Sequence, residues 1–136
     1  MQTLTTTSER ETEAAGQAMA QRLAPGTVVL LTGPLGAGKT AFVRGLAAGL
    51  ECDMAGVSSP TFTIIQEYSG PVRLQHVDLY RLSPGEVDDL LLEDLMDDAV
   101  MAVEWPDRWL RAPANAIRVD IVPTGDNERR LTVVGI

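Results

Sequence analysis

The chain of 136 residues lacks most features of secreted, disulfide-bonded or membrane proteins. Its single cysteine, Cys52, can form neither an internal disulfide nor a metal site by itself. A reduced thiol in a cytoplasmic protein is therefore expected. The longest apolar runs are far shorter than the about 20 residues that cross a bilayer. The N-terminus also lacks the basic and apolar regions of a secretory signal.

Positive charge and aromatic residues are also scarce. The net charge of −8 argues against broad, unassisted binding to DNA or RNA, which needs a basic surface. It leaves open work on RNA through a partner. Aromatic residues make up only 4% of the chain, so the core must consist mainly of Leu, Val, Ile and Ala. The only lysine is Lys39 and the only histidine is His76.

The hydrophobic pattern alternates between short apolar runs and amphipathic segments. This alternation predicts an α/β fold, a single domain over residues 1–136 with a mixed central sheet flanked by helices. The glycine-rich segment GPLGAGKT at residues 33–40 makes the expected domain P-loop NTPase-like. The length suits one domain. We expect strands near residue 4 and at 27–32, 62–68, 72–78, 100–104, 117–122 and 131–134, and helical segments at about 9–23, 39–50 and 84–95.

The strongest motif is GPLGAGKT at residues 33–40, which matches the G-x-x-x-x-G-K-[ST] phosphate-binding loop. Glycines let successive N–H groups turn toward phosphate oxygens, and the helix that follows aims its positive end at the same anion. Lys39 is expected to reach the β- and γ-phosphates, and the Thr40 hydroxyl to reach Mg²⁺. The predicted nucleotide contacts are Gly33, Leu35, Gly36, Ala37, Gly38, Lys39, Thr40 and Ala41.

Two acidic residues end predicted strands, where ligands sit in α/β sheets. Asp78 and Glu104 are therefore candidates to hold Mg²⁺ or its water, and Glu104 could also activate the attacking water. Each could equally be a solvated acid at a strand end. Thr61 lies in a loop where a hydroxyl could contact Mg²⁺ or the γ-phosphate, although a plain turn is the simpler interpretation. His76 has the same strand parity as Asp78, and a hydrogen-bonded structural histidine is favoured over a catalytic one.

Taken together, these segments resemble the TsaE family, formerly YjeE, the ATPases of bacterial tRNA threonylcarbamoyladenosine modification. The resemblance covers roughly residues 30–110. It rests on four stretches in the family's order: LTGPLGAGKT at 31–40, VSSPTFT at 57–63, HVDLYRL at 76–82 and VEWPDR at 103–108.

The resemblance implies ATP and Mg²⁺ as cofactors and assigns roles to the candidate acids. Asp78 would be the Walker B-like metal residue, Glu104 would be important for hydrolysis, and Thr61 would lie in a switch-like segment near the γ-phosphate. The implied partner is the TsaD–TsaB transferase pair, with tRNA contacted only indirectly. Pro34 stands where the family usually has Asp, which removes an N–H and puts any role of that acid in doubt.

Two other functions remain open from the sequence. A small-molecule kinase could use Arg108 and Arg111, although no lid segment is evident. A nucleotide-gated binding module with negligible turnover would need no catalytic residues. A GTPase is disfavoured because no N-K-x-D tetrad occurs. Residues 82–106 carry eight acidic and no basic residues, which indicates either a solvated face or a docking surface for a basic partner.

Overall fold

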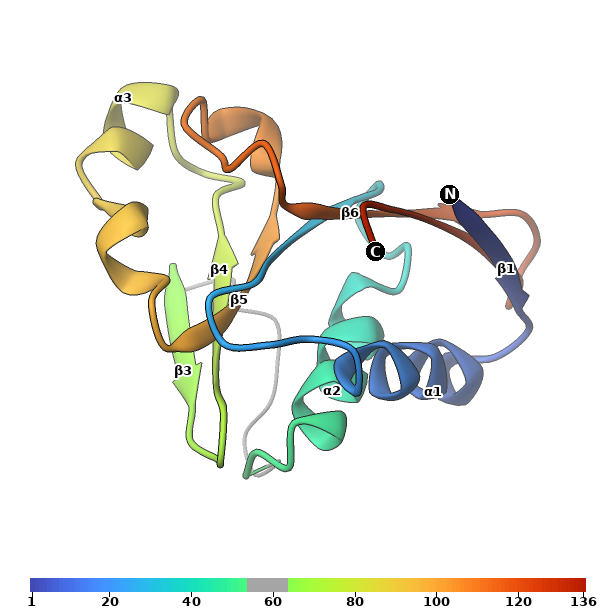
Figure 1. Cartoon of the computed structure of the whole chain (residues 1–136). Helices are drawn as coiled ribbons and strands as arrows, with labels where there is room; N and C mark the ends of the chain where they lie inside the picture. The colour runs from blue at the N-terminus through green and yellow to red at the C-terminus, as the bar shows by residue number, and fades with distance from the viewer. Residues whose placement is uncertain (54–63) are drawn as a thin grey trace.

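Seven strands form one sheet in the order β1-β7-β6-β2-β5-β4-β3 (Figure 1). The computed structural model describes residues 1–53 and 64–136. The strands are β1 (Gln2–Thr6), β2 (Val28–Thr32), β3 (Ile65–Tyr68), β4 (Arg73–Asp78), β5 (Ala99–Glu104), β6 (Ile117–Pro123) and β7 (Arg129–Val134). The helices are α1 (Glu9–Ala20), α2 (Lys39–Gly49), α3 (Pro84–Asp88) and the 3₁₀ turns η1 (Leu92–Leu95) and η2 (Pro106–Arg108).

The four central strands, β6, β2, β5 and β4, are parallel, and the outer strands pair antiparallel. The mixed sheet predicted from the sequence is thus confirmed. Parallel pairing brings the carboxyl ends of β2, β5 and β4 to one edge of the sheet. The ends of those strands are Thr32, Glu104 and Asp78, and Asp78 lies directly opposite Glu104 in the register. This edge is where an α/β sheet binds its ligands.

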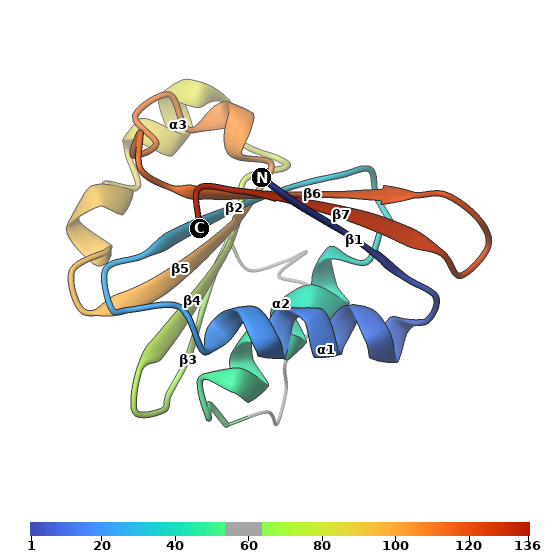
Figure 2. The same cartoon turned by 45° about the vertical axis from the view of Figure 1, so that its right-hand side comes forward.

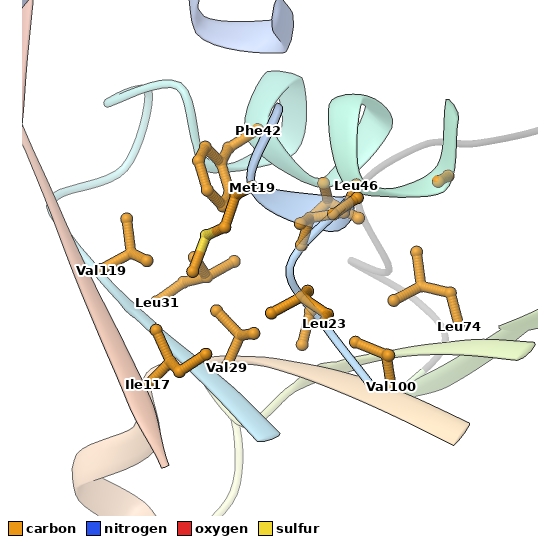
Figure 3. Packing of buried hydrophobic residues seen from close by; sticks show 14 of the residues in the cluster. Met19, Leu23, Val29, Leu31, Phe42, Leu46, Leu74, Val100, Ile117 and Val119 are labelled. Carbon is orange, nitrogen blue, oxygen red and sulfur yellow. The ribbon is translucent and has the colours of Figure 1, made fainter. Parts of the chain in front are cut away.

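The two central strands β2 and β5 are apolar up to their last residue, because helical segments cover both faces of this part of the sheet (Figure 2). In β2, Val29 and Leu31 pack toward α1 and α2, whereas Val28 and Leu30 pack toward the side of α3, η1 and η2. Figure 3 shows the first of these cores, in which Phe42 of α2 lies among aliphatic side chains from both helices and the sheet. The core is therefore mainly aliphatic, as the scarcity of aromatic residues predicted.

Helices α1 and α2 pack unusually closely against each other. A Cβ atom added to Gly45 of α2 would lie 1.9 Å from the carbonyl oxygen of Glu13 in α1. A Cβ atom on Gly16 of α1 would lie 2.3 Å from the carbonyl oxygen of Phe42. The two glycines therefore allow backbone-to-backbone contact that fixes α2, and with it the loop that precedes α2.

Some predicted boundaries were wrong by a few residues. Helix α1 ends at Ala20 rather than near residue 23, because the next amides bond three residues back in a 3₁₀ turn ahead of Pro25. The acidic helical segment at 84–95 is interrupted at Leu91, whose φ of 52° separates α3 from η1. Residues 62–63 of the predicted strand lie outside the described residues. Within the described ranges, no helix is long and apolar enough to cross a membrane.

Candidate functional site

The predicted phosphate loop connects β2 to α2 at the carboxyl edge of the sheet. Gly33, Gly36 and Gly38 have φ angles of 147°, 78° and 107°, which favour glycine. A Cβ atom on Gly33 would also lie 2.4 Å from the carbonyl oxygen of Ile121. The Ala37 amide donates to the Pro34 carbonyl at 3.1 Å, so Pro34 opens a turn in which its missing N–H is not required. The loop is thus formed with proline in that position.

Lys39, the first residue of α2, is buried, with 5% of its surface exposed. Its Nζ donates to the Gly33 carbonyl at 2.7 Å and lies 3.8 Å from Glu104 Oε1. The same nitrogen lies 4.2 Å from the centre of a Trp105 ring. Burial lowers the pKa of Lys39, and the charges of Glu104 and Asp78 oppose that shift. The ammonium group is therefore held beside the loop by a carbonyl, a carboxylate and an aromatic ring.

Glu104 ends β5 and is almost fully buried. Its Oε2 lies 2.6 Å from Nε2 of His76, while its Oε1 faces Lys39. The sequence favoured a structural histidine here, and the structure shows that its hydrogen-bond partner is a candidate catalytic residue. His76 Nδ1 has no hydrogen-bond partner among the described residues.

Asp78 ends β4 beside Glu104 and is only partly buried. Its Oδ1 accepts a hydrogen bond from the Tyr80 amide at 2.9 Å. Burial raises the pKa of Asp78, the Tyr80 amide lowers it, and the nearby charge of Glu104 raises it further. The two candidate acids therefore differ in environment: Glu104 is buried and engaged through both oxygens, whereas Asp78 is closer to solvent.

A short aromatic cluster covers this end of the sheet. Trp105 has a φ of 60°, and its ring lies 4.9 Å from that of Tyr80. Arg108 donates to the carbonyl oxygens of Leu79 and Tyr80 and lies near both rings. The guanidinium of Arg108 therefore holds η2 against the two residues that follow β4.

A cavity of about 330 Å³ opens at the loop and is large enough for a small ligand. The phosphate loop, the start of α2 and Glu104 line it. Residues that the sequence did not indicate for the site also line it: Ser8, Glu9, Thr12, Asn127 and Arg129. Arg129 of β7 donates to the Ala37 carbonyl at 2.9 Å and also to three carbonyls of the β6–β7 turn. The turn and the phosphate loop, far apart in sequence, are thereby joined.

The structure brings most of the predicted site residues to this cavity or next to it. Leu35, Gly36, Gly38, Lys39, Thr40, Ala41 and Glu104 line it, Gly33 accepts from Lys39, and Asp78 pairs with Glu104 in the register. Ala37, within the loop, is fully buried. Thr61 lies outside the described residues. No sequence signal marked Arg129 or Asn127, since a turn between two strands carries no motif.

Oxygen donors for a metal ion are few at this edge of the sheet in the described part of the chain. Among residues 1–53 and 64–136, no three His, Cys, Asp or Glu side chains are arranged to hold a metal ion. Mg²⁺ in nucleotide sites usually takes one or two protein oxygens together with phosphates and water. The hydroxyl of Thr40 and the carboxylate of Asp78 suit that chemistry.

Comparisons with known proteins agree on one family. The model of the family "Threonylcarbamoyl adenosine biosynthesis protein TsaE" matches residues 6–131. A TsaE protein from Bacillus subtilis is 39% identical over 96% of this chain and 84% of its own length. One from Synechocystis sp. is 46% identical over 73% of this chain and 66% of its own length. The crystal structure of Bacillus subtilis YdiB superimposes with a TM-score of 0.77 at 34% identity, covering 97% of this chain and 83% of that one.

Proposed function

Because this chain belongs to the TsaE family of threonylcarbamoyl adenosine biosynthesis proteins, we propose that it hydrolyses ATP in that tRNA modification. In this proposal it acts in the cytoplasm with the TsaD–TsaB pair and does not transfer the group itself. The observation that carries the proposal is the buried Lys39 ammonium at the head of α2, between the phosphate loop and Glu104.

The phosphate loop and Lys39 would bind the triphosphate. The loop amides and the N-terminus of α2 supply partial positive charge, and Lys39 supplies a full one. In this proposal a phosphate oxygen replaces the Gly33 carbonyl as the acceptor of Lys39. The positive charge would then stabilise the negative charge that develops on the transferred phosphoryl group.

The strand-end acids would divide the remaining work. Thr40 and Asp78 would hold Mg²⁺, which would neutralise phosphate charge, and Glu104, opposite Asp78 in the register, would be a further candidate ligand. Glu104 would also orient the attacking water through Oε1, since Oε2 is occupied by His76. Thr61 is proposed to act near the γ-phosphate.

The kinase alternative has little support from the two arginines. Arg108 is engaged with backbone carbonyls, and Arg111 is exposed and lies 4.0 Å from Asp88. A nucleotide-gated binding module with negligible turnover is the remaining alternative. It shares the nucleotide site and differs only in the rate of hydrolysis, so measured turnover separates the two.

The deciding experiment measures Mg²⁺-dependent phosphate release from ATP, alone and with purified TsaD–TsaB, together with threonylcarbamoyladenosine formed on tRNA. We expect turnover that rises with the partners and falls by about 100-fold or more in Lys39→Ala, because a transition-state cation is lost. Arg118→Ala, which removes an exposed cation from β6, is the control and should match the wild type. Modification that survives Lys39→Ala would refute the ATPase role, whereas nucleotide-dependent partner binding without turnover would establish the binding module.

A further inference from the structure

Few polar groups contact the buried carboxylate of Glu104 in the described part of the chain. Its side chain is 5% exposed, so water contributes little to holding it. One oxygen faces Lys39 at 3.8 Å, longer than a hydrogen bond, and the other lies 2.6 Å from His76. The short contact with His76 is therefore the stronger geometric restraint on this carboxylate.

The register explains how His76 reaches that position. His76 lies opposite Ala102, and Asp78 lies opposite Glu104, so the four side chains share one face of the sheet. Leu74, Ala102 and Val100 on the same face pack into the core beneath α1 and α2, which places the histidine below Glu104 and on the side of Lys39. The small side chain of Ala102 leaves space for the imidazole to lean toward β5.

The imidazole of His76 makes one hydrogen bond among the described residues. His76 is fully buried, yet among the described residues its Nδ1 has no partner and its Nε2 bonds only Glu104. A buried polar atom without a partner is costly and calls for an explanation. An ionised carboxylate can only accept, so the bond from His76 to a Glu104 carboxylate requires the hydrogen on Nε2. In the neutral tautomer that carries this hydrogen, Nδ1 has a lone pair and no N–H.

We propose that His76 is a positioning residue for the hydrolytic reaction. Its Nε2–H holds Oε2 of Glu104 and thereby aims Oε1 at the Lys39 side of the cavity. This inference rests on the proposed ATPase function, because it assumes that Glu104 contributes to hydrolysis. If Lys39 turned from Glu104 toward a bound phosphate, the bond from His76 would still hold Glu104 in place.

The bond itself can be tested without any activity. His76 is the only histidine, so ¹⁵N-labelled protein prepared without a histidine tag gives imidazole signals from this one ring. We expect long-range ¹H–¹⁵N spectra to show a hydrogen on Nε2, and the Nε2 signal to move in Glu104→Gln. Asp107→Asn, an exposed acid on η2, is the matched control and should leave the signal unchanged. A hydrogen on Nδ1 alone, or equal responses to the two substitutions, would overturn the assignment.

The positioning role is tested by two substitutions of similar size. The amide of His76→Gln can donate from a place close to Nε2, whereas the shorter amide of His76→Asn cannot reach it. We expect His76→Asn to lower kcat by about 10–100-fold, as loss of an outer partner of a catalytic ligand does. His76→Gln should recover most of that loss. KM for ATP should stay unchanged in both variants, because neither touches the phosphate loop.

The outcomes separate this inference from the function on which it rests. Turnover in the wild type that does not depend on Lys39 would refute the proposed function, and the spectra would still decide whether His76 holds Glu104. Equal losses of kcat in the two variants that follow their melting temperatures would show a purely structural histidine. No loss in either variant would equally overturn the proposal.

Discussion

The face of the sheet beneath α1 and α2 is filled by apolar side chains, whereas the carboxyl end of the same sheet buries polar and charged ones. Beneath α1 and α2, hydrophobic side chains fill the space between helices and strands (Figure 3). At the strand ends, Lys39, His76 and Glu104 are buried together, half of the six buried polar or charged residues in the described part of the chain. Burial of apolar surface stabilises a fold, whereas burial of charge costs free energy unless the charges are paired.

The contrast indicates where stability and function reside. Packing on the apolar face fixes α2 in position. The rigid α2 then holds Lys39 in the charged end, although its burial there costs free energy. Burial shifts the pKa values of Lys39 and Asp78 in opposite directions, each toward its neutral form. Such shifted groups in a cavity are typical of functional sites. Substitutions on the two sides should therefore change different properties.

The largest effect on stability is expected from the contact between α1 and α2. Gly45→Ala would place a methyl group 1.9 Å from the Glu13 carbonyl, so the helices must separate. We expect a loss of about 3 kcal/mol in the free energy of unfolding, measured by urea denaturation. The control is Gly85→Ala in α3, where nothing lies within 4 Å of the added atom. Equal stability of the two variants would show that the apolar face tolerates rearrangement.

Asp78→Asn should change both the stability of the protein and its ATP turnover. Because burial raises the pKa of Asp78 in the folded protein, the ionised carboxylate destabilises the fold above that pKa. The amide removes this cost, so the ligand-free variant should be more stable at neutral pH by about 1 kcal/mol. The advantage should shrink as pH falls through the folded pKa, where the wild-type carboxyl becomes neutral. Thermal melts across pH measure this.

The same Asp78→Asn variant should lose Mg²⁺-dependent ATP turnover by about 10–100-fold. A gain in stability with a loss of turnover is the pattern expected of a functional acid. A variant that is less stable at neutral pH would show that Asp78 stabilises the fold. Asp78 would then no longer belong to the groups of the charged end whose burial costs stability.

The smallest effect is expected where the β6–β7 turn meets the phosphate loop. Arg129→Ala removes the donors to the Ala37 carbonyl, which should loosen the loop and weaken nucleotide binding by about 1 kcal/mol, or about fivefold in Kd. Calorimetric titration with ADP measures the change. Arg130→Ala, an exposed neighbour on the same strand, should bind as the wild type does. Equal affinities of all three proteins would mean that the turn does not support the loop.

Local patterns in the sequence determined much of this protein. The apolar runs predicted β2 and β5, since strands buried on both faces must be apolar throughout, and GPLGAGKT predicted the turn into α2, because its glycines adopt positive φ angles. The acids at the ends of β4 and β5 were found in the same way. These features depend on residues adjacent in the chain, so the order of residues is enough to reveal them.

Only the tertiary structure decided which distant groups meet. Strand order places Asp78 opposite Glu104 and lets His76 reach across to β5, and neither contact follows from spacing along the chain. The packing of β7 beside the phosphate loop brings Arg129 to Ala37, 92 residues away. The sequence named the chemical groups of the site, whereas their pairing and burial came from the sheet, because a charge acquires its neighbours only when separate strands are brought together.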